Sequence, residues 1–154
     1  MCKGKDVLII NKHDGSVLEF RIKTKDKIEN VKKIISEVEG IPTDRQELYC
    51  NGMPLEDQTD VKVLKPGMVV KLVERIEVIL KMLTNETFIV RNLTPTDLVK
   101  KLEIFFEMHR GIPQDQFRLV FRNKDDILSS ERTLSSYGIK HNSTVVVVLD
   151  LAGS

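Results

Sequence analysis

Two short hydrophobic runs near the start of the chain, residues 7–10 and 17–22, have the composition of β-strands. Asp14 and Gly15 lie between them, and an Asp-Gly pair favours a tight turn whose two central residues take positive φ. Residues that alternate between the two faces of a strand give one buried face and one exposed face. The first twenty-odd residues therefore predict a β-hairpin.

A helical pattern follows the hairpin. Asp26 and Glu29 have the spacing of a capping box, and Gly40 followed by Pro42 is a typical helix stop. Between these signals, apolar residues recur at helical spacing, namely Ile28, Val31, Ile34, Ile35 and Val38. Two further strands are predicted at 47–50 and 68–73, with a turn at Asn51-Gly52 after the first of them. One helix with one apolar stripe covers one face of such a sheet.

The second half of the chain repeats the first. The triplet Gly40-Ile41-Pro42 recurs as Gly111-Ile112-Pro113, an offset of 71 positions (111 minus 40). The same offset pairs Val7 with Val78, Ile9 with Leu80, Val31 with Leu102, Ile35 with Phe106 and Leu48 with Leu119. It predicts strands at 78–81, 88–91, 117–122 and 144–149 and a helix at 96–110. We therefore expect an α+β protein of two domains, 1–75 and 76–154, each with its own core.

Several short motifs, taken together, resemble the ubiquitin family. They are the segments 26–32, 39–42, 51–57 and 132–139, and the resemblance runs through roughly residues 5–75 and 76–154. It implies two tandem ubiquitin-like β-grasp domains, each a mixed sheet wrapped around one main helix, with no catalytic centre. Members of the family act by being recognised, or by being attached through their C-terminus to other proteins.

The outer face of the second predicted sheet offers a partner-binding patch. Period-two alternation turns Leu119 and Phe121 inward and places Arg118 and Val120 outward. The last strand adds Val146 and Val148, and Leu83 lies at the hairpin tip. The resemblance implies that these apolar positions match the hydrophobic patch through which receptors bind the family, with Val146 in place of the usual histidine. The alternative is that valine suits a strand whichever way it points.

The corresponding face of the first domain is expected to be polar. The same alternation sets Tyr49, Lys71 and Val73 outward, and Lys12 and His13 lie at the hairpin. Between the predicted domains only Glu74 and Arg75 separate Val73 from Ile76. The resemblance implies that a ubiquitin-type protease would not separate the halves, because this junction contains no glycine.

The end of the chain departs from the pattern of a conjugated family member. The resemblance implies a terminal Gly-Gly, whose bare backbone enters narrow enzyme sites, whereas this chain ends in Ala152, Gly153 and Ser154. Asp150 reverses the charge at a position that the family uses to engage its activating enzyme. Two readings remain open: an altered tail that is not conjugated, or removal of Ser154 to leave Gly153 at the end.

Composition excludes several other functions. With 24 basic and 23 acidic side chains the formal charge is +1, so we expect no nucleic-acid binding. No apolar stretch fits a signal peptide or a membrane span, and we expect a cytoplasmic or nuclear monomer with reduced thiols. Cys50 lies at a predicted core position, and the three histidines lack the spacing of metal ligands. We expect no catalytic residue, no metal and no cofactor.

Two classes of function remain. The first is a protein tag or modifier-like recognition module in the ubiquitin-proteasome system, bound through the second domain. The second is an adaptor or decoy that binds ubiquitin receptors or ligases without being attached to them. The expected partners are proteins of the ubiquitin system: receptors, ligases and proteasomal subunits.

Overall fold

The computed structural model describes residues 7–23, 25–65, 68–123 and 125–150, and the side chain of Phe20 is not described. The chain divides into two compact units, Met1–Glu74 and Arg75–Ser154, which we call domain 1 and domain 2. This division falls one residue before the predicted one. Each domain contains a mixed sheet and one α-helix, so the predicted α+β class is confirmed.

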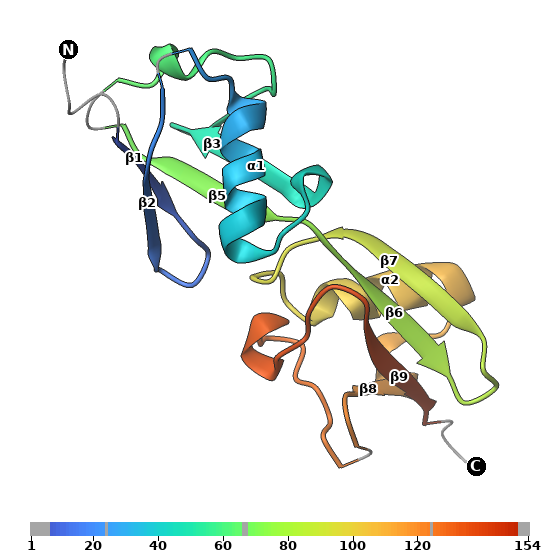
Figure 1. Ribbon diagram of the computed structural model, residues 1–154. Coiled ribbons are helices and arrows are strands. Elements are labelled where there is room, and N and C mark those ends of the chain that lie inside the picture. The colour runs from blue at the N-terminus through green and yellow to red at the C-terminus, as the bar shows by residue number, and fades with distance from the viewer. Residues whose placement is uncertain (1–6, 24, 66–67, 124, 151–154) are drawn as a thin grey trace. The chain divides into compact units, whose positions relative to one another are not determined.

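Domain 1 is a five-stranded sheet with a single helix across it (Figure 1). Its strands are β1 (Val7–Asn11), β2 (Val17–Arg21), β3 (Gln46–Cys50), β4 (Met53–Pro54) and β5 (Val70–Glu74), and its helix is α1 (Ile28–Glu39). The strand order is β2-β1-β5-β3-β4, in which β1 and β5 are parallel and the other neighbours are antiparallel. The helix buries Ile28, Val31 and Ile35, which share one side of it.

Domain 2 has the same order of elements in a four-stranded sheet. Its strands are β6 (Ile76–Met82), β7 (Thr87–Leu93), β8 (Phe117–Val120) and β9 (Ser143–Leu149), and its helix is α2 (Lys100–Arg110). The strand order is β7-β6-β9-β8, with β6 and β9 parallel. The helix begins later than predicted, at Lys100, and β8 ends earlier, at Val120.

The two domains do not align at one offset throughout. In the hairpins, Gly15 and Asn85 both have positive φ and occupy the same turn position, which gives an offset of 70. A bulge between Ile76 and Val78, with Asn92 at φ 61 on the opposite strand, adds one residue to β7 and restores the offset of 71. The predicted pairings of Val7 with Val78 and of Ile9 with Leu80 were therefore wrong: Val7 and Ile9 are exposed, whereas Val78 and Leu80 are buried. A shift of one residue exchanges the two faces of a strand.

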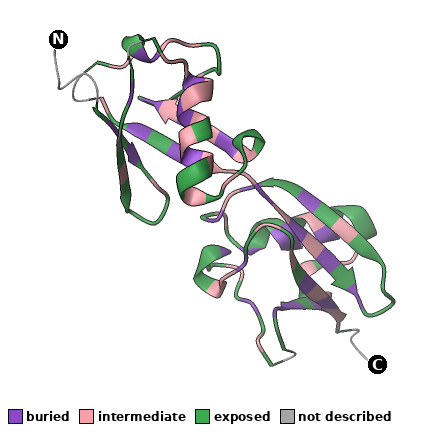
Figure 2. Cartoon of the chain, viewed as in Figure 1, coloured by how far each residue is buried: buried purple, intermediate pink, exposed green. Residues whose placement is uncertain are grey.

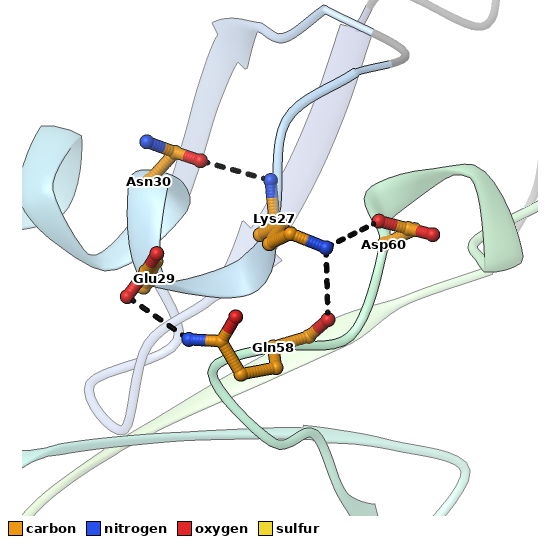
Figure 3. A network of polar contacts seen from close by, with 5 residues as sticks. All are labelled: Lys27, Glu29, Asn30, Gln58 and Asp60. Carbon is orange, nitrogen blue, oxygen red and sulfur yellow. Dashed lines mark hydrogen bonds and ion pairs between the residues drawn. The ribbon is translucent and has the colours of Figure 1, made fainter.

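The start of α1 also differs from the expectation. The predicted capping box at Asp26 and Glu29 was wrong: the backbone N–H of Lys27 donates to Asn30 Oδ1 at 2.9 Å, one residue later. Figure 3 shows how Lys27 Nζ then reaches Asp60 Oδ1, at 3.0 Å, and the carbonyl of Gln58. These contacts attach the first turn of the helix to the segment that precedes β5 in the chain.

The turns follow glycine chemistry as expected, with one correction. Gly40 ends α1 at φ 74, and its N–H donates to the carbonyl of Ser36. In the first hairpin Gly15 has φ 85, whereas Asp14 is not among the residues with positive φ. Asp14 instead accepts hydrogen bonds from the backbone and hydroxyl of Ser16, which fix the turn by a side-chain contact.

Buried residues alternate with more exposed ones along β1 of domain 1 and β6 of domain 2 (Figure 2). In domain 1 the described core is aliphatic and includes Ile10, Ile28 and Leu48. In domain 2 the core includes aromatic rings: Phe106 packs against Phe117 with ring centroids 4.8 Å apart and against Phe88 at 5.9 Å. Each helix faces its own sheet across one of these cores, which leaves the opposite sheet face outside.

Candidate functional site

The outer face of the domain 2 sheet is defined by strand register. Lys81 lies opposite Val146 in the parallel pair β6–β9, and Val146 lies opposite Val120 in the antiparallel pair β8–β9. Val120 in turn forms a bridge with Ile127, and Lys81 is opposite Thr87 on β7. These five residues form one row across the sheet. Neighbouring rows contribute Ile79 opposite Ile89, and Arg118 opposite Val148.

Val120 is not exposed as the sequence predicted. Only 5% of its surface is accessible, although it does not belong to the core cluster of domain 2. Val120 points to the outer face, as alternation predicts, but the residues after β8 fold back along this strand. The N–H of Leu128 donates to the carbonyl of Leu119 at 2.9 Å, and the N–H of Phe121 donates to the carbonyl of Asp126. The added segment brings Ile127 beside Val120. Coverage by this segment and by Val146 explains the burial of Val120 on an outward position.

The other predicted residues do lie on the outer face or at its edge. Val146 and Val148 are half-buried and Arg118 is exposed. Leu83, in the hairpin after β6, is 74% exposed. Strand register therefore brings Arg118, Val146 and Val148 together, with Val120 directly opposite Val146.

Sequence reasoning missed three isoleucines on this face. Ile127 is 54% exposed and Ile89 is 44% exposed, while Ile79, opposite Ile89, is half-buried. Ile127 lies beside Val120 on one side of β9, and Ile79 and Ile89 lie on β6 and β7 on the other side. The signal for Ile79 was in the sequence, because it alternates with Val78 and Leu80, but the wrong hairpin offset hid it. We call the surface formed by Ile79, Lys81, Arg118, Ile127, Val146 and Val148 the docking face.

Two cations belong to the docking face. Lys81 is exposed, and within the described residues it forms no ion pair. Arg118 Nη1 lies 3.4 Å from Asp150 Oδ2, with 44% and 67% of the two side chains exposed. Asp150 follows β9, and its backbone N–H donates to the carbonyl of Gln116 at 2.8 Å. The predicted charge reversal at Asp150 therefore has a definite contact, since its carboxylate meets an arginine of the docking face.

The remaining predicted tail residues, Ala152, Gly153 and Ser154, lie outside the described residues. Cys50 is buried, as expected for a core thiol. His141 Nδ1 accepts a hydrogen bond from the N–H of Glu77, and His109 stacks on Phe105, so each has a packing role within domain 2. In the described part of the chain, no cluster of His, Cys, Asp and Glu side chains could hold a metal ion.

Domain 1 has a different outer face, and the prediction that it is polar was only half right. Tyr49 and Lys71 are opposite each other on β3 and β5, as expected. On the hairpin side, however, Ile9 is 43% exposed and Val17 is 54% exposed. Glu19 lies directly opposite Ile9, so the apolar side chains of this face are interrupted by charge. Val7 and Val69, which alternation also turns outward, are 36% and 50% exposed. The difference between the domains lies on the last strand, where Val146 of domain 2 replaces Lys71 of domain 1.

These features define a pair of small domains of the β-grasp type, each a mixed sheet on one helix. The sequence model of the ubiquitin family matches residues 7–77 and again residues 78–152. The chain therefore belongs to the ubiquitin family and contains the ubiquitin-like unit twice. Proteins of this family are generally not enzymes. No described helix has the length and apolar character needed to cross a membrane.

Proposed function

We propose that the protein is a tandem recognition module of the ubiquitin system, bound by its partners through the docking face of domain 2. The observation that supports this most strongly is the apolar surface formed by Ile79, Val146, Val148 and Ile127 on a sheet face that its own helix leaves uncovered. An exposed apolar surface with polar residues at its rim is characteristic of docking sites. In this proposal the protein acts as a monomer in the cytoplasm or nucleus.

The charges of the docking face favour an acidic, amphipathic partner. Lys81 and Arg118 lie on opposite sides of Val146, separated by two strand spacings and two residues along the strand. From strand geometry this separation is about 12 Å between backbone positions. An α-helix rising about 1.5 Å per residue covers that distance in seven or eight residues. A helix with two carboxylates about two turns apart and apolar residues between them fits both the charges and the valines.

Binding through this face should be weak. Full burial of an aliphatic side chain contributes about 1.5–3 kcal/mol, but Val146 and Val148 are already half-buried and association itself opposes binding. We therefore expect micromolar dissociation constants of the kind that suit transient receptors. Receptors, ligases and proteasomal subunits of the ubiquitin system are the partners proposed.

Attachment to substrates and action as an unattached adaptor or decoy are the two forms that this function could take. The first follows the family. The second is favoured by Asp150, whose carboxylate opposes the positive charge expected for engagement of an activating enzyme and is already paired with Arg118. Incubation with ubiquitin-family activating enzymes and ATP tests the difference. A thioester formed by the chain as written supports the tag; no thioester, even after removal of Ser154, supports the adaptor.

Two exposed residues allow a test without damage to the fold: Ile127, which belongs to the docking face, and Leu83, which lies at its edge in the hairpin after β6. Ile127→Asp and Leu83→Asp change side chains that are 54% and 74% exposed. Each should weaken binding to purified ubiquitin-receptor domains by about tenfold, the effect of about 1.4 kcal/mol. Val17→Asp in domain 1, also 54% exposed, is the matched control and should leave binding unchanged. Equal binding by all three variants and the unmodified protein in isothermal titration calorimetry would refute the proposed site.

A further inference from the structure

The arginine of the docking face is already occupied by a carboxylate from the same chain. Asp150 Oδ2 lies 3.4 Å from Arg118 Nη1, and the backbone N–H of Asp150 is bound to the carbonyl of Gln116. This backbone hydrogen bond extends the β8–β9 ladder by one contact beyond the pair Phe117–Leu149. Asp150 is therefore positioned by the sheet itself, and its carboxylate lies at the edge of the surface where a partner would bind.

The Arg118–Asp150 ion pair is weak enough to be exchanged. Both side chains are substantially exposed, at 44% and 67%, and exposed pairs of this kind contribute only about 0–1 kcal/mol. A partner carboxylate that approaches Arg118 replaces one carboxylate with another, so it gains less than it would at a free arginine. Lys81 differs, because within the described residues it has no anionic partner to displace.

The opposite charges occur at the equivalent positions beside β5, the last strand of domain 1, although Arg75 itself is the first residue of domain 2. Glu47 lies opposite Val73 just as Arg118 lies opposite Val148, and two residues further along are Arg75 and Asp150 respectively. In each case the residue that follows the last strand has the opposite charge to its diagonal neighbour on the adjacent strand: Arg75 to Glu47, and Asp150 to Arg118. In domain 2 the cation, Arg118, belongs to the docking face. The residue after the last strand, Asp150, therefore competes with acidic partners for it.

We infer that Asp150 regulates the docking face as a built-in competitor: it holds Arg118 and lowers the affinity for partners that present a carboxylate there. This inference rests on the proposed function. It predicts selectivity, because a partner that binds through apolar contacts alone does not meet the competition. It also predicts that neutralising Asp150 strengthens binding of acidic partners specifically.

The test uses the full chain and two synthetic helical peptides of the same apolar sequence. One peptide carries two glutamates seven positions apart, and the other has glutamine at both places. Binding is measured to the unmodified protein, to Asp150→Asn and to Asp115→Asn, which removes an exposed carboxylate of the same domain outside the docking face. The first variant keeps the backbone N–H that bonds to Gln116, so the strand end stays in place.

We expect Asp150→Asn to bind the glutamate peptide about two- to fivefold more tightly than the unmodified protein, as the strength of an exposed ion pair implies. The glutamine peptide should bind both proteins equally, and Asp115→Asn should change neither affinity. If Asp150→Asn and Asp115→Asn raised the affinity for the glutamate peptide equally, the effect would come from net charge alone, and the inference would be overturned. If the glutamate peptide bound Asp150→Asn and the unmodified protein with the same affinity, the inference about Asp150 would be overturned but the docking face would be supported. Absence of binding by either peptide would overturn both.

A second measurement examines the free protein. The Nε–Hε resonance of Arg118 should shift in Asp150→Asn and remain unchanged in Asp115→Asn, because only the first variant removes the carboxylate beside it. An identical Arg118 resonance in all three proteins would show that the ion pair does not persist in solution, and would contradict the inference without any ligand.

Discussion

The two domains share the arrangement of the hairpin, the helix and the last strand, but different kinds of side chain fill their cores. At the centre of α2 lies Phe106, in edge contact with Phe88 and Phe117, whereas the equivalent residue of α1 is Ile35. Among the residues whose burial the structure describes, the core of domain 1 is entirely aliphatic apart from Cys50. Aromatic side chains bury more area and add favourable edge contacts. The comparison shows that either aliphatic or aromatic side chains can fill the space between the helix and the sheet of this fold.

The polar contacts in the first half of each helix also differ between the two domains. In domain 1, Lys32 forms an ion pair with Asp57 at 2.6 Å. In domain 2 the corresponding contact is a hydrogen bond at 2.5 Å from the hydroxyl of Ser130 to Glu103, which is 8% exposed. Both contacts attach the helix to the loop before the last strand. What the two domains share is the position of the contact rather than its charge.

Three ionisable side chains of domain 1 have shifted pKa values. The hydrogen bond from Lys27 lowers the pKa of the Asp60 carboxyl, and the hydroxyl of Ser16 lowers the pKa of Asp14. The Glu39 carboxylate, 2.5 Å from Lys12 Nζ, raises the pKa of that ammonium group. The stability of domain 1 therefore depends on pH through these specific contacts.

The strongest way to test this contrast is to remove the central ring of domain 2. Phe106→Ala should lower the free energy of unfolding of domain 2 by about 3–5 kcal/mol, from lost burial and the cavity that remains. Met108→Ala, on the same helix but 78% exposed, is the control and should have little effect. Hydrogen exchange followed by mass spectrometry reports each domain separately. Loss of protection in domain 1 as well would show that the two cores are one cooperative unit.

A second test compares the outer faces at one equivalent position. Val120→Arg places a charge where only 5% of the side chain is exposed, and should destabilise domain 2 by at least about 2 kcal/mol. Tyr49→Arg, its counterpart in domain 1, changes a half-buried residue whose hydroxyl donates to Glu47, and should be tolerated. Thermal unfolding measures both. If Val120→Arg is as stable as the unmodified chain, the added segment does not cover Val120 in solution.

The smallest expected effect comes from giving domain 1 the residues of domain 2 at the helix start. Lys27 and Asp60 form a bridge that Leu98 and Thr133 form in domain 2. Lys27→Leu with Asp60→Thr should shift the melting temperature by less than about 4 °C at neutral pH, because the ion pair is exposed.

The same double variant should change the response to acid. A carboxyl whose folded pKa is lowered stabilises the fold above its unfolded pKa, about 3.9 for aspartate, and this contribution is lost as pH falls through the folded value. Domain 1 of the variant should therefore lose less stability than the unmodified domain when the pH falls below about 4. An unchanged acid profile would mean that Asp60 contributes nothing to it.

Much of the fold followed from the sequence because its signals are local or repeated. Gly40 and Gly111 end the two helices at φ 74 and φ 68, as their positions before Ile-Pro predicted. The hairpin offset could not be read in this way. The bulge at Asn92 depends on which residue of β7 faces Ile76, a register between strands that no local pattern fixes.

The sequence predicted which side chains of the docking face point outward, but it did not predict how exposed they are. Alternation along β8 and β9 placed Arg118, Val146 and Val148 on the outer face. It did not predict that residues after β8 would pair with it and cover Val120, because that pairing depends on the path of a loop. The Arg118–Asp150 contact needed the same cross-strand information, since the two residues are 32 positions apart in the chain.

The measurement that tests the central claim most directly is a titration of the ¹⁵N-labelled full chain with the glutamate peptide, followed by NMR. The account predicts chemical-shift changes that cluster at Lys81, Arg118, Ile127, Val146 and Val148, with the signals of domain 1 unmoved. Changes confined to domain 1 or to the exposed side of α2, or no changes at all, would contradict it.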